Sequence, residues 1–463
     1  RIIQYFKAKG CKFTTVADLM GKTKDDVMPI AKNDWKTGTS FMFAEATYWL
    51  GNFIFALFLI GIFLSITRIL VIALLAWIQK RKESKQAIVI PFISKKPFPL
   101  VSIIVPAYNE EVNAERTVNS LLQQNYPNLE IVFVDDGSKD ATYTKVNNAF
   151  QDIDNVYVFK KFNGGKASAL NFGIEKASGE FVVCIDADTQ LKKDAVTQLM
   201  KKFTGAEVGA VAGNVKVGNE INMITKWQSI EYITSQNFDR RAFDYLNCIT
   251  VVPGAIGAFN KEAIIKAGGF TTDTLAEDCD LTMRLHKCGY DVKNCTEAIS
   301  YTEAPETMKQ FMKQRFRWSF GVMQCFWKHR DALFNPTYKN LGMIALPNIL
   351  IFQMILPFLA PLADLVLIIS LILAALNIIP LSTGHILLYY LIFSLVDMAG
   401  AALAFAYEKE DYKKLIWMIP QRFIYRQLMY YILFKSFNKA LKGELQGWGV
   451  LKRTGNVKQL TSV

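Results

Sequence analysis

Histidine and paired cysteines are scarce in this chain. Its 463 residues include three histidines and seven cysteines, and no two cysteines form a Cys-x-x-Cys pair. A zinc site with the usual cysteine and histidine spacing is therefore not expected, and the disulfide scaffold of a small secreted domain is excluded. We interpret the cysteines as mostly buried or free thiols in a reducing compartment.

Charged residues are also few. They make up 20% of the chain against 51% hydrophobic residues, although lysine and arginine exceed the acids enough to give a net charge of +12. This composition excludes a disordered chain and is too apolar for an ordinary soluble protein. We therefore expect membrane segments beside one large catalytic domain.

The first stretch that lacks charge predicts a transmembrane helix. Residues 46–80 contain a single charged residue, Arg68, before the Lys-Arg-Lys cluster at 80–82. The run exceeds the roughly 20 residues that span a bilayer, and a buried core helix is the alternative. Arg68 is expected either to reach towards the membrane surface or to mark where the helix leaves the hydrocarbon. The basic cluster places residues 1–45 outside the cytoplasm.

A second apolar stretch, residues 340–407, carries only Asp364 and Asp397 as charged residues. It is long enough to cross a bilayer twice, so we expect it to fold back at a turn over 381–384. The next apolar run, 415–434, contains two arginines. It either spans the membrane or lies at the interface as an amphipathic helix.

Between the apolar stretches, short β-branched runs alternate with helical ones. The predicted strands are 101–109, 131–137, 156–159 and 181–188, and the predicted helices are 110–124, 139–150 and 166–177. This alternation predicts an α/β fold with a mostly parallel sheet. Ligands of such sheets bind beyond the carboxyl ends of the strands, where Asn109 and two pairs of acids stand.

The acid pairs suit a nucleotide and a cation. Asp186 and Asp188 point to opposite sides of an extended segment, so one can bind Mg²⁺ or Mn²⁺ while the other holds a ribose or phosphate. A solvated turn is the alternative. Asp135 and Asp136 could accept hydrogen bonds from a nucleobase or ribose, or merely cap the next helix. Lys166 follows two glycines at a helix start, which makes either an anion site or a plain loop lysine.

Two further motifs point to group transfer. Glu277 and Asp278 precede a helical pattern, where a carboxylate could take a proton from a sugar hydroxyl or simply complement the helix dipole. Gln314, Arg317 and Trp318 lie in a basic, aromatic stretch. Arginine could neutralise a leaving diphosphate and tryptophan could stack on a sugar. The alternative is an amphipathic helix that rests on anionic lipid.

In chain order, the motifs are PAYNE (106–110), VDDGS (134–138), NGGKASALN (163–171), DAD (186–188), VPGAIGAF (252–259), AEDCDL (276–281) and QRFRW (314–318). Together they resemble the processive, membrane-embedded family 2 glycosyltransferases, such as cellulose, chitin, hyaluronan and poly-β-1,6-N-acetylglucosamine synthases. The resemblance covers residues 95–335 and extends in architecture to both apolar regions. The stretch that leads into QRFRW is most similar to the branch that polymerises N-acetylglucosamine.

The resemblance implies an α/β GT-A fold, a UDP-sugar donor, inverting transfer and Mg²⁺ or Mn²⁺ as cofactor. It implies that Tyr108, Asp135 and Asp136 hold the uridine, that Lys166 holds the diphosphate, that Asp188 binds the metal with Asp186 beside it, that Asp278 is the general base, and that Gln314, Arg317 and Trp318 border the acceptor end and the diphosphate. As members of the same motifs, Glu110 and Gly254 are assigned to substrate binding and Glu277 to catalysis. Many members have threonine or glycine where this chain has Ala276, but the base is present.

Residues 1–40 resemble the closing helix, strand and helix of a NodB-type polysaccharide deacetylase. A segment this short cannot carry that enzyme's metal site, so we expect it to end a longer, fused deacetylase domain. The predicted orientation agrees, because a deacetylase should face the side where the polymer emerges.

The predicted segments are a deacetylase remnant at 1–40, a transmembrane helix at 46–80, a cytoplasmic GT-A domain at 95–305, interfacial amphipathic helices with QRFRW at 306–339, transmembrane or interfacial helices at 340–436, and a basic cytoplasmic tail at 437–463. We expect a multi-pass protein of the cell membrane that binds a UDP-sugar, a growing polysaccharide and lipid, and no nucleic acid. The competing hypotheses are a nonprocessive transferase that adds one sugar to a lipid and a catalytically silent scaffold or transporter.

Overall fold

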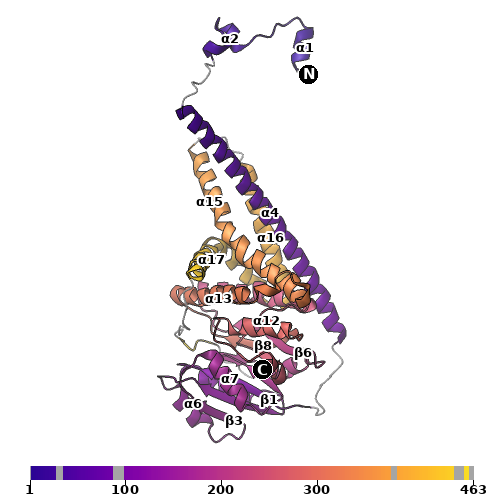
Figure 1. Cartoon of the computed structure of the whole chain (residues 1–463), viewed down its shortest axis with the longest axis vertical. Coiled ribbons are helices and arrows are strands. Elements are labelled where there is room, and N and C mark those ends of the chain that lie inside the picture. Colours follow the sequence, from indigo (N-terminus) through magenta and orange to yellow (C-terminus); the bar gives the residue numbers. More distant parts are fainter. Residues whose placement is uncertain (1, 28–34, 87–97, 377–382, 443–452, 458–463) are drawn as a thin grey trace. The chain divides into compact units, whose positions relative to one another are not determined.

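The computed structural model describes residues 2–27, 35–86, 98–376, 383–442 and 453–457 (Figure 1). The chain divides into two units, residues 1–60 and 61–463, each treated by itself. Part of the predicted turn, 381–382, and most of the predicted tail beyond 442 lie outside the described residues.

The first unit contains short helices and the beginning of a long one. The helices are α1 (Ile2–Ala8), α2 (Val16–Leu19), α3 (Lys24–Val27) and the start of α4 (Trp35–Gln86). Thr15 caps α2, because its Oγ1 accepts a hydrogen bond from the Asp18 amide at 3.2 Å. The strand that the deacetylase resemblance predicts between the first two helices is not formed: in the described part of this unit, residues 11–15 have no regular structure. An extended segment becomes a strand only when another strand completes its hydrogen bonds.

Within the described residues, two helical stretches are long and apolar enough to cross a membrane. They are Gly38–Glu83, with a mean hydropathy of 2.6, and Leu341–Leu362, with 2.0. Only 6% and 22% of their most apolar windows are buried in the protein. Large apolar side chains such as Phe63 and Leu70 are consequently exposed on α4, which is the pattern of a helix that faces lipid rather than water.

Arg68 of α4 forms an ion pair with Asp239 and donates from Nε to the Asn348 side-chain oxygen at 3.1 Å. A fixed carboxylate stabilises a partly buried arginine, so its charge is neutralised within the second unit. The place of Arg68 relative to a bilayer stays a prediction.

A single sheet organises the middle of the second unit. The strands are β1 (Val101–Ala107), β2 (Leu129–Asp135), β3 (Val156–Lys160), β4 (Phe181–Cys184), β5 (Thr189–Leu191), β6 (Val208–Val217), β7 (Gly257–Asn260) and β8 (Asp291–Thr302). Their order is β3-β2-β1-β4-β7-β6-β8-β5. The first four are parallel to one another, while β7 is antiparallel to both β4 and β6. The predicted α/β fold is confirmed, with a sheet that is mixed rather than purely parallel.

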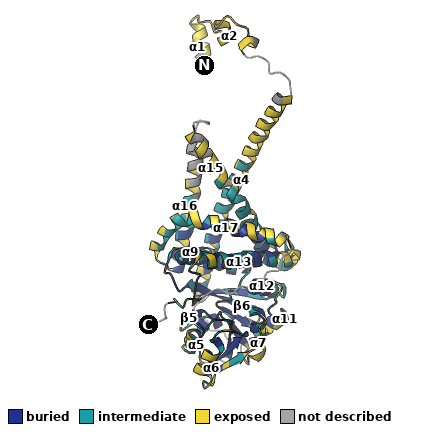
Figure 2. Cartoon of the chain, turned by 90° about the vertical axis from the view of Figure 1, so that its left-hand side faces the viewer, coloured by how far each residue is buried: buried dark blue, intermediate teal, exposed yellow. Residues whose placement is uncertain are grey.

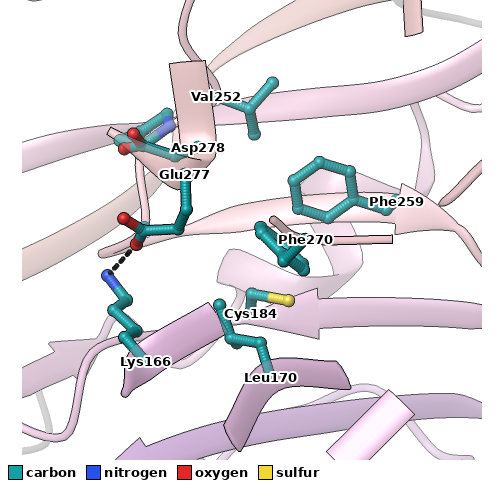
Figure 3. Close-up of a pocket in the computed structure, with 10 residues that line it drawn as sticks. Lys166, Leu170, Cys184, Val252, Phe259, Phe270, Glu277 and Asp278 are labelled. Carbon is teal, nitrogen blue, oxygen red and sulfur yellow. Dashed lines mark ion pairs between the residues drawn. The ribbon is translucent and has the colours of Figure 1, made fainter. Parts of the chain in front are cut away.

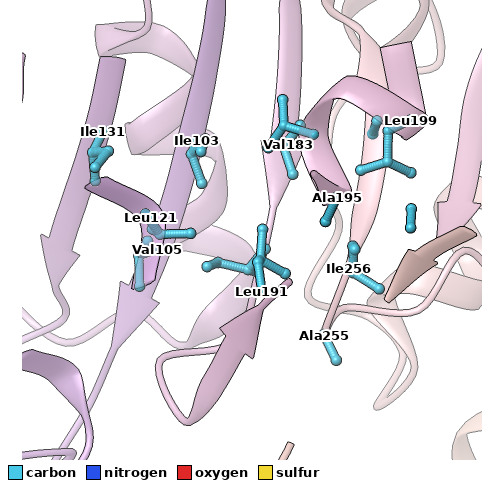
Figure 4. Close-up of a cluster of buried hydrophobic side chains, with 14 of the residues drawn as sticks. Ile103, Val105, Leu121, Ile131, Val183, Leu191, Ala195, Leu199, Ala255 and Ile256 are labelled. Carbon is cyan, nitrogen blue, oxygen red and sulfur yellow. The ribbon is translucent and has the colours of Figure 1, made fainter. Parts of the chain in front are cut away.

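Helices cover both faces of this sheet. They are α5 (Ala114–Leu122), α6 (Thr142–Phe150), α7 (Lys166–Lys176), α8 (Ala195–Met200), α11 (Lys261–Lys266) and α12 (Glu277–Lys287). Because side chains alternate along a strand, Ile103 shares one core with Leu121, Val183 and Leu199 (Figure 4). Its neighbour Ile104 packs with Leu170 in a second core. The two cores hold the sheet rigid, so the loops at its carboxyl edge have a fixed base.

The remaining helices of the second unit follow the sheet. They are α9 (Met223–Glu231), the π-helix η1 (Tyr232–Asn237), α10 (Phe238–Tyr245), α13 (Met308–Lys328), the 3₁₀ turns η2 (Arg330–Ala332) and η3 (Pro336–Tyr338), the π-helix η4 (Leu341–Ala345), α14 (Leu346–Asn348), the π-helix η5 (Ile349–Ile355), α15 (Leu356–Ala375), α16 (Thr383–Glu408), the 3₁₀ helix η6 (Tyr412–Trp417) and α17 (Met418–Leu441). Helix α13, which carries QRFRW, lies between α12 and α17 and is largely buried or half-buried (Figures 1 and 2). The predicted run 415–434 is helical, with its first three residues in η6 and the rest in α17. Helix α17 buries Tyr425 on the protein and leaves Phe423 exposed.

Candidate active site

The acid pairs come together because parallel strands end at one edge of the sheet. Strands β1 and β2 pair Ala107 with Asp135, and β1 and β4 pair Ile104 with Cys184. The loops that continue from these strands therefore converge. They meet over a cavity of about 920 Å³, whose lining includes twelve of the thirteen predicted site residues: Tyr108, Glu110, Asp136, Lys166, Asp186, Asp188, Gly254, Glu277, Asp278, Gln314, Arg317 and Trp318.

Asp135 is the predicted site residue that does not line the cavity. It is fully buried, and its Oδ2 accepts a hydrogen bond from the Ser138 amide at 3.1 Å. This contact closes the turn after β2, where Gly137 has a φ of 73° and an added Cβ would stand 2.9 Å from the Asn163 amide nitrogen. Glycine is required here because the turn needs positive φ and presses against the next loop.

The carboxylate of Asp136 already has its partners within the protein. It lies 2.6 Å from Lys161 Nζ and accepts hydrogen bonds from the amides of Gly164 at 3.0 Å and Gly165 at 2.7 Å. Asp136 thus holds the glycine loop that leads into α7. The side chain lines the cavity as predicted, but both of its carboxylate oxygens accept hydrogen bonds from the glycine loop.

Lys166 stands at the first turn of α7 between two acids. Its Nζ lies 2.6 Å from Asp186 Oδ1 and 3.1 Å from Glu277 Oε1. Burial opposes the charged ammonium, but the two carboxylates outweigh burial and raise the pKa of Lys166. Figure 3 shows this lysine reaching Glu277 above an apolar floor that includes Leu170 and Phe270. The lysine is a fixed positive charge at a helix N-terminus, the combination that binds phosphate.

At position 254, in the motif VPGAIGAF, an added side chain would meet Lys166. A Cβ at this position would stand 2.5 Å from Lys166 Nζ. The close approach leaves room for the lysine to sit between its two acids, so the backbone of 252–259 forms one wall of the charged pocket.

Asp278 lies in the first turn of α12, beside Glu277. Burial, and then the negative charge of Glu277, raise the pKa of Asp278 to about 6. Its Oδ1 accepts a hydrogen bond from the Cys279 amide at 2.8 Å, which fixes the carboxylate. A fixed carboxylate with a pKa near neutrality suits general base chemistry.

Asp188 is buried and paired with an arginine from the end of the chain. Its Oδ2 lies 2.6 Å from Arg453 Nη1, and its Oδ1 accepts hydrogen bonds from Thr189 and Thr302 at 3.3 Å each. Burial raises the pKa of Asp188 despite the nearby guanidinium. Asp186 differs: burial opposes its charge, but Lys166 overrides that effect and lowers its pKa. Neighbouring carboxylates therefore have different environments.

Arg453 and Glu303 are site residues that the sequence did not single out. Arg453 also lies 3.2 Å from Glu110 Oε1. Burial raises the pKa of Glu110 to about 8. The charge of Arg453 opposes this shift, and the negative charge of Asp188 adds to it. Glu303, 4% exposed, accepts hydrogen bonds from the amides of Thr454 at 2.7 Å and Gly455 at 3.0 Å. A basic residue in a basic tail carries no local pattern that marks it.

Gln314 and Trp318 of the QRFRW motif share one face of α13. Gln314 is 8% exposed, and Trp318 is half-buried against the main core beside Tyr232, with ring centres 6.1 Å apart. Residues four apart on a helix are neighbours on its surface, so Gln314 and Trp318 reach the same side of the cavity. The structure thus brings together all the predicted catalytic side chains.

A metal ion would need ligands from outside the protein here. In the part of the chain that the structure describes, no group of three histidines, cysteines or acids is arranged to hold one. Asp188, with Asp186 beside it, can supply one or two carboxylate oxygens, which is the number Mg²⁺ or Mn²⁺ takes when phosphate oxygens complete the sphere. The donor set fits such an ion together with a diphosphate.

Comparison with known proteins gives matches to glycosyltransferases. The model of Glycosyl transferase family 2 matches residues 102–268. Poly-beta-1,6-N-acetyl-D-glucosamine synthase of Staphylococcus epidermidis is 32% identical over 254 residues, which cover 51% of this chain and 62% of the relative. The Staphylococcus aureus enzyme of the same name is 32% identical over 48% of this chain and 54% of its own. The chain therefore spans less than two thirds of these relatives.

A solved structure supports the same assignment of fold. A mannosyltransferase from Pyrobaculum calidifontis, in complex with GDP-Man and Mn²⁺, matches with a TM-score of 0.56 and 24% identity over 83% of this chain and 99% of its own. The likeness confirms the predicted GT-A fold. The family match does not reach residues 1–40, so their resemblance to a deacetylase stays a prediction. Residues 102–268 thus match the model of glycosyltransferase family 2, within a chain that has the GT-A fold.

Proposed function

We propose that this protein is a processive, inverting β-glycosyltransferase of the cell membrane, which uses a UDP-sugar to synthesise and export a β-linked polysaccharide. The observation that carries the proposal is the single cavity in which the strand-end acids, Lys166, Asp278 and the QRFRW side chains meet. The similarity to staphylococcal poly-beta-1,6-N-acetyl-D-glucosamine synthases favours UDP-N-acetylglucosamine as the donor.

The donor is placed by charge. Tyr108 and Asp136 line the end of the cavity near β1 and β2, where we place the uridine. Lys166 and Arg317 supply the positive charge that the diphosphate needs. Mg²⁺ or Mn²⁺ at Asp188 would neutralise further charge on the leaving diphosphate. Oδ2 of Asp188 is paired with Arg453, so a metal ion held by this carboxylate would compete with that arginine.

Asp278 is placed to start the transfer. It accepts the proton of the acceptor hydroxyl while that oxygen forms a bond to the anomeric carbon of the donor. The bond from this carbon to the diphosphate oxygen breaks in the same step, so UDP leaves with the electron pair and the anomeric configuration inverts. A pKa of about 6 keeps Asp278 ionised at neutral pH and close enough to neutrality to exchange its proton.

The same cavity offers a route for a growing chain. Its lining also includes Phe352 of η5, Pro357 of α15 and Tyr430 of α17. Aromatic side chains give a sugar ring an apolar face to stack on. A path from the catalytic acids into the apolar helices supports processive export more than the transfer of one sugar to a lipid.

The membrane assignment rests on exposed apolar helices and on basic clusters. Helix α4 carries a window of mean hydropathy 2.6 with 6% of it buried, and the Lys-Arg-Lys cluster follows at 80–82. We place the glycosyltransferase domain in the cytoplasm and residues 1–45 outside it. A fused or associated deacetylase would then act where the polymer emerges.

A panel of radiolabelled UDP-sugars tests the proposal directly. The purified protein, with Mn²⁺ or Mg²⁺, is expected to convert UDP-N-acetylglucosamine into a product of high molecular mass and to release UDP. EDTA is expected to abolish the reaction and added metal to restore it, whereas an Asp188→Asn variant stays inactive. A product one sugar longer than a lipid acceptor would identify a nonprocessive transferase. No UDP release from any donor of the panel would identify a catalytically silent scaffold or transporter.

A further inference from the structure

Arg315, the second residue of QRFRW, is almost completely buried and paired. It is 1% exposed, and its Nη2 lies 2.5 Å from Glu231 Oε2, to which its Nε also donates at 3.1 Å. Glu231 ends α9, and the Tyr425 hydroxyl of α17 donates to the same carboxylate oxygen. The Glu231 carboxylate therefore joins α9 to α13 through Arg315 and to α17 through Tyr425.

The same guanidinium contacts the two residues that we place at the acceptor. Arg315 Nη1 donates to Gln314 Oε1 at 2.7 Å. Its central carbon lies 4.1 Å from the centre of the Trp318 ring, as expected for residues three apart on one helix face. Because the amide oxygen of Gln314 is used by Arg315, its NH₂ group is the part left to donate to a sugar hydroxyl.

The charge of Arg315 makes this arrangement rigid. Arginine keeps its proton in proteins, so a buried guanidinium requires a fixed carboxylate, and Glu231 then sets the plane of the group. A desolvated cation over an indole ring attracts it more strongly than an exposed one. Next to Glu231, the π-helix η1 begins at Tyr232, whose ring centre lies 6.1 Å from that of Trp318. Such π-helical turns often occur at functional sites.

We propose that Arg315 is a positioning residue for the acceptor. It sets the amide of Gln314 and the ring of Trp318, while Glu231 and Tyr425 tie both to α17. The inference rests on the proposed function, because only there are Gln314 and Trp318 acceptor residues. The contacts that structure the donor end, from Lys166 to Asp186 and from Asp136 to the glycine loop, do not involve this network.

The chain offers a matched control for the loss of a buried ion pair. Arg241 is 5% exposed, its Nη2 lies 3.8 Å from Glu408 Oε1, and it is not among the cavity-lining residues. The variants are Arg315→Lys, which keeps the charge but loses the planar fork, Tyr425→Phe, which removes one hydroxyl, and the control Arg241→Lys. The full-length protein in detergent is assayed with UDP-N-acetylglucosamine and short oligosaccharides cut from the wild-type enzyme's own polymer.

The readout is the KM of each substrate. Arg315→Lys is expected to raise the KM for the oligosaccharide by about tenfold and to leave the KM for the donor within about twofold, since only the acceptor contacts are disturbed. Tyr425→Phe should raise the acceptor KM by a smaller factor, and Arg241→Lys should change neither value. Equal shifts in both KM values, or none, would overturn the proposal.

A second variant covers the case in which Arg315→Lys does not fold. If Arg315→Lys loses its thermal unfolding transition, Tyr425→Phe decides the matter, and an unchanged acceptor KM in that variant overturns the inference. A wild-type protein that makes no polymer contradicts the proposed function itself. An active wild type with kinetically normal variants contradicts only the role of Arg315.

Discussion

The Nη1 atom of Arg453 lies 2.6 Å from Oδ2 of Asp188, the carboxylate that we expect to bind a divalent cation. Residues near the end of the chain therefore reach the middle of the site. The contact is held from several sides, because Glu303 binds the amides of Thr454 and Gly455, and Arg116 donates to the Gly455 carbonyl at 2.8 Å. If a divalent cation binds Asp188 as we propose, it competes with the guanidinium for one oxygen, since both are positive and need the same lone pairs.

Removing this arginine is expected to strengthen metal binding in the absence of donor. In Arg453→Ala, the dissociation constant for Mn²⁺, measured by electron paramagnetic resonance, should fall by about tenfold as the carboxylate loses its competing cation. Arg116→Ala, which loosens the same segment without touching Asp188, should show a smaller decrease. Lys287→Ala, which removes an exposed ion pair to Asp331, serves as the unrelated control. Weaker Mn²⁺ binding by Arg453→Ala would contradict competition.

The pH profile of kcat/KM tests whether Asp278 is the general base. Asp278 must be ionised to accept a proton, and its pKa is raised to about 6, so kcat/KM should rise with pH through about 6 and then level off. Asp278→Asn should lower kcat by at least about 100-fold while UDP-sugar binding persists, because volume is nearly unchanged. Glu110→Gln should leave the limb near pH 6 in place, since the pKa of Glu110 is raised further, to about 8. Loss of donor affinity in Asp278→Asn would show that the residue is not the base.

Substitutions of Trp318 and Arg317 should impair different steps of the reaction. Trp318→Ala is expected to lose polymer more severely than UDP release, because hydrolysis of the donor needs no platform for the acceptor. Arg317→Ala should lose both, because its charge faces the diphosphate in either reaction. Polymer length and UDP release are measured on the same sample. Polymer of unchanged length and yield from Trp318→Ala would assign the tryptophan to an interfacial helix.

Topology can be read from cysteine labelling. All seven cysteines are free; five are buried, Cys288 is half-buried and Cys11 is exposed. An impermeant maleimide applied to intact cells should label Cys11, because residues 1–45 are placed outside. An introduced Ser84→Cys should react only after the membrane is opened. Cys11→Ser should remove the outside signal, and labelling of position 84 in intact cells would reverse the predicted orientation.

Much of the site was readable from local patterns. The strand and helix periods around Ile103, Ile131 and Val183 predicted the β-α alternation, and the carboxyl ends of parallel strands had to meet. That rule alone placed Asp136, Asp186 and Asp188 at one edge of the sheet. The charge-poor runs likewise predicted the apolar helices, since a bilayer imposes length and composition on a single segment.

Contacts between distant segments were decided only by the tertiary structure. The pairing of Arg453 with Asp188, and that of Arg315 with Glu231 and Tyr425, join residues with no shared period or motif. Asp136 accepts hydrogen bonds from the glycine loop, and Arg68 forms an ion pair with Asp239. Periodicity reports which face of an element is apolar, but the partner of a charge depends on which elements the fold brings within a few ångströms, and there desolvation decides the pairing.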